Sequence, residues 1–198
     1  MIPRFYDVTL GRILVDGVDV RDMTQKELRD KLGYVPQKGV LFSGTIDSNI
    51  RYGKPEITDA QVKEAAEVAQ ATEFIDTKPE KYESPVSQGG TNVSGGQKQR
   101  LSIARAIAKD PEIFIFDDSF SALDFKTDSQ LRKALKEYTK DATTVIVAQR
   151  ISTILGADQI IVLDDGHMAG IGTHKELMAN CEVYQQIARS QLSEEELA

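Results

Sequence analysis

Two short segments of the sequence carry residue types that suit chemistry on a phosphate group. The first, Ser94 to Gln97, reads Ser-Gly-Gly-Gln and fits a capping box, in which the serine hydroxyl accepts a hydrogen bond from the Gln97 N–H. A helix is therefore expected to begin near Gly95. Glycines allow a ligand to approach the backbone, and the N–H groups and positive dipole end of a helix N-terminus favour an anion. The segment predicts a phosphate contact, although the same residues also fit an ordinary helix cap.

The second segment joins an apolar run to two carboxylates. Residues 113–116 read Ile-Phe-Ile-Phe after Pro111, as expected of a strand that is buried on both faces of a parallel sheet. The run ends in Asp117-Asp118. Because ligand sites of open α/β sheets lie beyond the carboxyl ends of the strands, two acids at this point indicate Mg²⁺ binding and water activation. A solvated strand end is the alternative interpretation.

Together these residues resemble the ATP-binding cassette (ABC) ATPases. Residues 94–97 match the family's signature motif, residues 113–118 its Walker B strand, and residues 121–124, Ser-Ala-Leu-Asp, its D-loop. The resemblance extends over essentially the whole chain, and residues 32–53 are similar to the exporter branch, which handles drugs and lipids. It implies an α/β fold: a P-loop NTPase (RecA-like) core with a mostly parallel sheet, antiparallel β hairpins and an inserted α-helical subdomain.

The resemblance also implies a role for individual residues, with ATP and Mg²⁺ as the cofactors. Asp118 and Gln149 stand at the catalytic positions, the general base and the switch residue. Gln37, which follows a predicted strand at residues 32–35, is the Q-loop glutamine and joins Asp117 as a Mg²⁺ ligand. The residues implied to contact ATP are Gln37, Ser94, Gly95, Gly96, Gln97 and Asp124.

Two of these positions depart from the family's pattern. Most exporters have glutamate where this chain has Asp118, and histidine where it has Gln149. Aspartate is one methylene shorter, and a misplacement of about 1 Å can cost on the order of 100-fold in rate. Glutamine can donate a hydrogen bond to phosphate but cannot carry positive charge near neutral pH. Since the signature motif is unaltered, the chain resembles the degenerate-site subunit of a heterodimeric exporter.

The phosphate-binding loop of the family, Walker A, has no match in the sequence. Gly53-Lys54 is followed by Pro55, so the pattern G-x-x-x-x-G-K-[ST] fails there. Residues 2–7 resemble the end of the helix that follows this loop in the family. We therefore expect an N-terminally truncated cassette, and we expect the isolated fragment to be inactive as an ATPase.

Local patterns predict the elements that position these residues. Capping boxes begin helices after Thr24, Thr58 and Thr173. Two hairpins are expected, around Asp16-Gly17 and around residues 164–166, with a further strand at 143–148. We expect three parts: residues 1–38, a partial RecA-like core with a hairpin and the Q-loop; residues 39–104, a helical subdomain ending in the signature motif; and residues 105–198, the rest of the ATP-binding core with Walker B, the D-loop, the switch position and the C-terminal helices.

Composition limits the partners. The formal net charge is −7, from 31 acidic and 24 basic residues, which argues against nucleic-acid binding because that requires clustered Lys and Arg. Cys181 is the single cysteine, so an internal disulfide is excluded. The sequence contains no apolar run long enough to span a bilayer. The expected location is the cytoplasmic face of the cell membrane, through a transmembrane domain outside this chain, with a second cassette as partner in a heterodimer.

Three functions remain open at this stage. The first is an ATP-hydrolysing subunit that couples ATP binding and hydrolysis at a cassette dimer interface to export. The second is a regulatory or structural cassette that completes a partner's ATP site through the signature motif but barely hydrolyses. The third is a soluble ABC protein of DNA repair or translation, against which the exporter-like Q-loop segment and the acidic balance argue.

Overall fold

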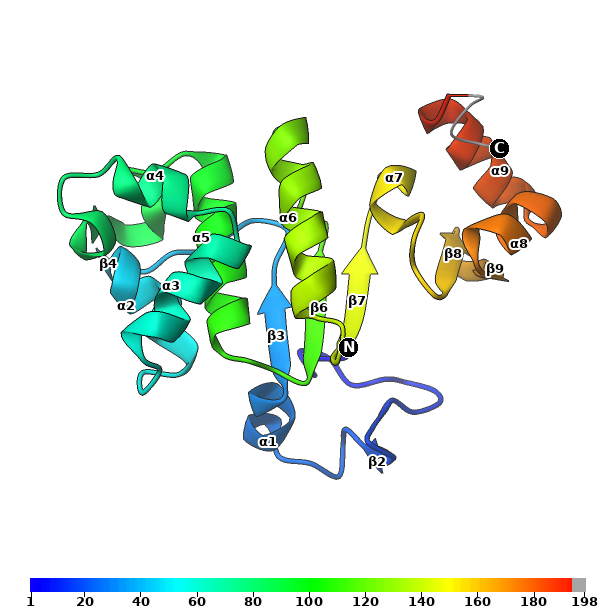
Figure 1. The fold of residues 1–198 in the computed structure, drawn as a ribbon. Helices are drawn as coiled ribbons and strands as arrows, with labels where there is room; N and C mark the ends of the chain where they lie inside the picture. Colours follow the sequence, from blue (N-terminus) through cyan, green and yellow to red (C-terminus); the bar gives the residue numbers. More distant parts are fainter. Residues whose placement is uncertain (194–198) are drawn as a thin grey trace. The chain divides into compact units, whose positions relative to one another are not determined.

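The computed structural model describes residues 1–193 and separates into two compact units, which are described one at a time. The first unit is Met1–Val147 and the second begins at Ala148. Both are shown in Figure 1.

The first unit contains short strands, helices and 3₁₀ turns (η) in an alternating order. Its elements are β1 (Leu14–Val15), β2 (Val18–Asp19), α1 (Gln25–Asp30), β3 (Leu32–Val35), β4 (Gly44–Thr45), α2 (Ile46–Ile50), η1 (Arg51–Gly53), α3 (Asp59–Val68), α4 (Thr72–Asp76), η2 (Lys81–Glu83), β5 (Pro85–Val86), η3 (Gln88–Gly90), α5 (Gly95–Ala108), β6 (Ile113–Asp117), α6 (Phe125–Tyr138) and β7 (Thr143–Val147).

A three-stranded parallel sheet in the order β3-β6-β7 forms the centre of this unit (Figure 1). Val35 of β3 pairs with Phe116 of β6, and Phe116 pairs with Ile146 of β7. The predicted buried strand is thus confirmed as the middle strand. Phe114 and Phe116 belong to the core with α3, α5 and α6, whereas Ile115 packs with the β1–β2 hairpin and α1. Because alternate residues point to opposite faces and both faces are covered, the run is apolar without alternation.

The helical part of the first unit packs around α5. Helix α3 presents Val62, Ala65 and Ala66 to the core that it shares with Leu101 and Ile107 of α5. The small alanines allow close approach of the helices. In Figure 1, α2, α3 and α4 lie on the side of α5 that faces away from the parallel sheet.

The second unit is built on one antiparallel hairpin. Its elements are α7 (Ile151–Ile154), β8 (Ile160–Asp164), β9 (His167–Gly172), α8 (His174–Asn180) and α9 (Glu182–Gln191). Ile160 and Val162 of β8 form a core with Leu177 of α8 and Tyr184 of α9. The Tyr184 hydroxyl lies 2.8 Å from Nδ1 of His174, so this buried phenol has a polar partner.

Most local predictions are confirmed. Complete capping boxes are present at Thr24, Thr58, Ser94 and Thr173, and both hairpins form. A fifth box, between Thr45 and Ser48, was not predicted because serine replaces the usual Glu or Gln. The sequence of residues 193–198, Ser-Glu-Glu-Glu-Leu-Ala, predicts a solvated tail, and all of it except Ser193 lies outside the described residues. Within residues 1–193, no helix is long and apolar enough to cross a membrane.

Candidate functional site

The Q-loop and the end of the Walker B strand meet at one edge of the parallel sheet. Gln37 follows β3, and its Nε2 donates to Oδ2 of Asp118 at 3.1 Å. The hydroxyl of Tyr34, on β3, donates to Oδ2 of Asp117 at 3.2 Å. These contacts follow from the pairing of β3 with β6, since parallel neighbours end at the same edge. The structure therefore brings Gln37 to the strand end that carries Asp117 and Asp118, and their roles in binding Mg²⁺ and ATP stay predictions.

The backbone after β6 is held in a turn that any residue other than glycine adopts only at some cost. Asp118 has φ +44°, in the left-handed region, where aspartate is more common than most residues. Its N–H donates to the Val147 carbonyl and its own carbonyl accepts from the Ser121 hydroxyl. The buried Ser119 hydroxyl donates to the Val35 carbonyl at 2.9 Å. Both neighbouring strands thus fix the position of Asp118.

The signature motif begins helix α5. Ser94 is the N-cap, and its hydroxyl accepts from the Gln97 N–H, while the Gln97 side chain accepts from the Ser94 N–H at 3.2 Å. Ser94 and Gly95 are exposed, and a Cβ added at Gly95 would meet no heavy atom within 4 Å. At Gly96 it would lie 3.5 Å from the Ala122 carbonyl oxygen of the D-loop. The helix N-terminus is therefore open on the Gly95 side and borders the D-loop on the other.

Asp124 is the N-cap of α6. Its carboxylate accepts from the Thr127 N–H at 3.0 Å and from the Thr127 hydroxyl at 2.7 Å. These hydrogen bonds lower the pKa of Asp124 below its ordinary value. Asp124 thus has a structural role, and an ATP contact by it stays a prediction.

Gln149 belongs to the second unit and follows β7. It is exposed, and its backbone carbonyl accepts from Nε2 of Gln191 at 2.9 Å. Its catalytic role, like that of Asp118, stays a prediction.

The oxygen donors at the sheet edge fit Mg²⁺. With Gln37 Nε2 donating to Asp118, the amide oxygen of Gln37 is the atom available to a cation. At Asp117, Tyr34 contacts Oδ2 and leaves Oδ1 for a metal ligand. Mg²⁺ in nucleotide sites takes one or two protein oxygens and completes its shell with phosphates and water. Residues 1–193 contain no group of three or more His, Cys, Asp or Glu side chains arranged to hold a metal ion.

Three residues near the site were not found by sequence reasoning: Tyr34, Ser119 and Gln99. Each acts through a bond to a residue 60 or more positions away, and such pairs leave no local pattern. Gln99 is a buried residue of α5 whose amide contacts the Q-loop backbone.

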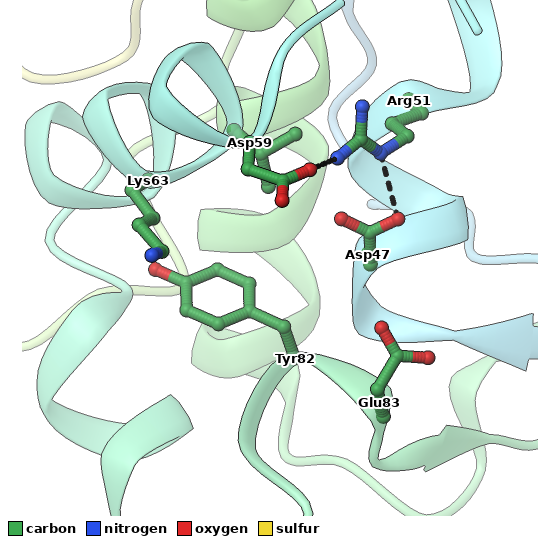
Figure 2. A pocket seen from close by; sticks show the side chains of 7 residues that line it. Asp47, Arg51, Asp59, Lys63, Tyr82 and Glu83 are labelled. Atoms are coloured by element: carbon green, nitrogen blue, oxygen red, sulfur yellow. Dashed lines mark hydrogen bonds and ion pairs between the residues drawn. The ribbon is translucent and has the colours of Figure 1, made fainter.

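A separate pocket of about 170 Å³ lies between α2, α3 and η2 (Figure 2). Arg51 fills one side of it and is paired with Asp47 and Asp59. Figure 2 shows the Tyr82 hydroxyl directed toward Lys63 on the other side. The pocket shares no residue with the predicted ATP site, and the charges of Arg51 are matched within the chain.

Comparison with known proteins identifies the family that the chain resembles. The profile of the ABC transporter family matches residues 1–121. The chain is 47% identical over 194 residues to an ABC transporter ATP-binding protein of Mycobacterium tuberculosis (strain ATCC 25618 / H37Rv), covering 96% of the chain and 33% of that protein. It is 47% identical over 187 residues to a protein of Staphylococcus aureus (strain NCTC 8325 / PS 47) described as a candidate multidrug export ATP-binding/permease protein, covering 94% of the chain and 32% of that protein.

Among solved structures, a bacterial Atm1-family ABC exporter with ATP bound matches 98% of the chain with a TM-score of 0.93 and 41% identity, over 34% of that exporter's chain. The chain thus spans about a third of the length of the relatives it matches. From the signature helix, the Walker B edge and these matches, we conclude that the chain belongs to the ABC transporter family, as an ATP-binding cassette similar to those of exporters.

Proposed function

We propose that this chain forms part of the ATP-binding cassette of an exporter, and that it couples ATP binding and hydrolysis to export at an interface with a second cassette. Two relatives are named as ATP-binding or ATP-binding/permease proteins, which supports a transmembrane domain as partner and a place at the cytoplasmic face of the membrane. We refer to the complete assembly, including the Walker A loop, transmembrane domain and partner cassette, as the assembled exporter.

The observation that carries this proposal is the contact between Gln37 and Asp118. In the proposed site, Gln37 and Asp117 would hold Mg²⁺, which would supply positive charge to the phosphates of ATP. Water attacks the γ-phosphorus, its proton passes to the Asp118 carboxylate, and the bond to the β,γ-bridging oxygen breaks to give ADP and phosphate. Asp118 is short and its Oδ2 already accepts a hydrogen bond from Gln37, so this site is proposed to be slow.

The signature motif serves the other site of the dimer. The N–H groups of exposed Gly95 and half-buried Gly96 and the Ser94 hydroxyl would face the γ-phosphate of ATP held by the partner cassette. Donors fixed in advance at a helix N-terminus stabilise the charge of the transferring group. The two sites of the dimer are therefore proposed to be unequal, with turnover dependent on the one that this chain completes.

The test is steady-state phosphate release by the assembled exporter. Ser94→Arg places a long side chain where phosphate must meet the backbone and should nearly abolish activity. Asp118→Ala should reduce it much less. Ala60→Arg, at an exposed position in the first turn of α3, is the matched control and should leave activity unchanged. Equal damage from Asp118→Ala and Ser94→Arg would show that Asp118 is a working base and that the two sites are alike.

The second candidate, a regulatory cassette, is favoured by the left-handed turn at Asp118 together with its short side chain. In that case Asp118→Ala would leave phosphate release unchanged, while Ser94→Arg would still abolish it. An intermediate loss with Asp118→Ala supports slow hydrolysis at this chain's own site.

A further inference from the structure

A buried glutamine on α5, the helix that begins with the signature motif, forms hydrogen bonds to the Q-loop backbone on both sides of Gln37. Gln99 is 2% exposed, and its Oε1 accepts from the Gly39 N–H at 2.9 Å. Its Nε2 donates to the Pro36 carbonyl at 3.1 Å. One side chain therefore satisfies backbone groups on both sides of the Gln37-Lys38 pair, and the two bonds fix the orientation of the amide because one partner is a donor and the other an acceptor.

The backbone of the Q-loop also lies directly against α5. A Cβ added at Gly39 would fall 2.8 Å from the Ser102 hydroxyl oxygen and 3.0 Å from the Lys98 carbonyl oxygen. Ser102 itself is buried and donates to Lys98. No side chain fits between loop and helix, so the contact is close and has little freedom to slide.

The other end of the same helix carries the signature motif. Gln99 lies five positions after Ser94, in a helix that begins at Gly95 and continues to Ala108. At about 1.5 Å per residue, Gln99 lies on the order of 7 Å along the helix axis from the N-cap Ser94. A helix and the two hydrogen bonds of the buried Gln99 side chain therefore connect the signature motif to the Q-loop. At the far side of the loop, Gln37 contacts Asp118.

We propose that Gln99 is a positioning residue that couples the two ATP sites through this chain. It makes the placement of Gln37, in the site built on β6, depend on the placement of Ser94 to Gly96, which complete the partner's site. The proposal rests on the proposed function, because it needs both sites. A buried glutamine that only stabilises the fold would connect the same atoms, so the test must measure coupling.

The first measurement is a double-mutant cycle on kcat in the assembled exporter, with Gln37→Ala and Ser94→Ala made singly and together. Coupled residues give a combined effect that differs from the product of the single effects. We expect a deviation of about fivefold or more with Gln99 present, as for a coupling of about 1 kcal/mol. In the Gln99→Met background, which keeps the length of the side chain but removes both hydrogen bonds, the deviation should fall within about twofold.

Asn49→Leu is the matched control. Asn49 is 1% exposed, and its amide also brackets a loop, accepting from the Phe42 N–H and donating to the Phe42 and Thr45 carbonyls at 2.9 Å each. Its loss removes the same kind of buried bond from a place outside the two sites. In the Asn49→Leu background, the combined effect of Gln37→Ala and Ser94→Ala should still deviate from the product of the single effects, even where stability falls. If this deviation is lost, Gln99 has only a structural role.

The second measurement is hydrogen exchange, which does not depend on turnover. In Gln99→Met the Gly39 amide should exchange faster, because its acceptor is gone, while amides of residues 98–108 keep their protection. Introduced into the wild-type protein, Ser94→Arg should change the exchange of the amides of residues 37–39. Introduced into Gln99→Met, it should leave their exchange unchanged. Where Gln99→Met folds poorly, Gln99→Asn, which keeps an amide on a shorter side chain, should give an intermediate coupling.

These outcomes separate the two proposals. An assembled exporter with no Ser94-dependent phosphate release would overturn the proposed function. A different outcome would overturn only the coupling role of Gln99. In it, phosphate release still depends on Ser94, while Gln99→Met changes neither the deviation in the double-mutant cycle nor the exchange of the Gly39 amide.

Discussion

Tyr34 and Asp117 lie on paired strands, and the phenol hydroxyl donates to the carboxylate Oδ2 at 3.2 Å. Burial, with the nearby charge of Asp117, raises the pKa of Tyr34, so its hydroxyl stays protonated and acts as a donor across the neutral range. The hydrogen bond restricts the orientation of the carboxylate and leaves Oδ1 for the predicted contact with Mg²⁺. Tyr34 thus orients Asp117, the predicted Mg²⁺ ligand, through the oxygen that does not contact the metal.

Tyr34→Phe should raise the Mg²⁺ concentration that half-saturates phosphate release by the assembled exporter, by about tenfold, because residues that orient a metal ligand have effects of this size. The maximal rate at saturating Mg²⁺ should change much less. Tyr138→Phe is the control, since its hydroxyl donates to the Ile107 carbonyl at 3.4 Å on another helix. An unchanged Mg²⁺ dependence in Tyr34→Phe would mean that Asp117 needs no such support.

Arg105 should contribute to stability through its donors. Its guanidinium donates to the Asn49 and Val40 carbonyls at 2.8 Å each and lies over the rings of Phe42 and Tyr52. Burial lowers its pKa to about 10, so it is still charged at neutral pH. Arg105→Met keeps the length but leaves the carbonyl of the buried residue Asn49 without this donor, which should cost about 2 kcal/mol of unfolding free energy.

Urea unfolding of the 198-residue chain measures this loss. The control is Lys133→Met, at an exposed position on α6, which should stay within about 0.5 kcal/mol of wild type. Equal urea midpoints for Arg105→Met and Lys133→Met would contradict the structural role of Arg105.

Local signals in the sequence predict much of this fold, because helix caps, hairpin turns and buried strands depend on neighbouring residues. The capping boxes at Ser94 and Thr173 give the start of α5 and α8, and the Ile-Phe-Ile-Phe run gives β6. The pairing of Gly44–Thr45 with Pro85–Val86 was missed, since two-residue strands show no periodicity. The Gln99 bracket was missed because its partners are 60 and 63 positions away.

The candidate site was also predicted only in part from the sequence. The sequence marks Gln37 and Asp118 as the ends of two strands, and the contact between them follows from the parallel pairing of these strands, which the structure shows. Asp124 and Gln97 were assigned to ATP, and in the structure their carboxylate and amide oxygens accept hydrogen bonds at the starts of α6 and α5. Motif resemblance assigns a position to a function but does not say which atoms the local backbone already uses. For these two residues the nucleotide contact stays a prediction.

Asp124 should make stability depend on acid pH. Its pKa is lowered from 3.8 by the hydrogen bonds from Thr127. A carboxyl with a lower pKa in the folded state stabilises above its unfolded pKa, and this contribution is lost as the pH falls through the folded pKa. The chain should therefore lose stability as the pH falls below 3.8. Asp124→Asn keeps a capping oxygen but does not titrate.

The measurement compares the urea midpoints of wild type and Asp124→Asn from neutral pH to about pH 2.5, a range that spans the protonation of carboxyls. The advantage of wild type should shrink as the pH falls. Glu64→Gln, at an exposed position on α3 that caps no helix, is the control and should show a smaller change. A difference that is constant with pH would show that the charge of Asp124 does not contribute.

Two glycines should separate stability from activity. A Cβ at Gly33 would lie 2.6 Å from Cγ of Pro111 and 3.3 Å from the Ala106 carbonyl oxygen, so Gly33→Ala forces β3 or its neighbours to move. Such overpacking should cost about 1–3 kcal/mol. A Cβ at Gly95 would meet nothing within 4 Å, and alanine favours a helix over glycine, so Gly95→Ala should leave unfolding free energy unchanged or slightly higher.

For phosphate release we expect the opposite: Gly95→Ala should be the more damaging change and Gly33→Ala the less damaging one. In the assembled exporter, Gly95→Ala places a methyl group where the proposed phosphate of the partner site approaches the backbone, so phosphate release should fall by about tenfold or more, the cost of a 1–2 kcal/mol loss in transition-state contact. Gly33→Ala should keep its rate per folded molecule at a temperature where it is folded. The pair is measured by urea unfolding and by phosphate release on the same preparations. Full activity in Gly95→Ala would mean that the glycine only begins the helix, and the phosphate contact would then have to rest on Ser94 and Gly96.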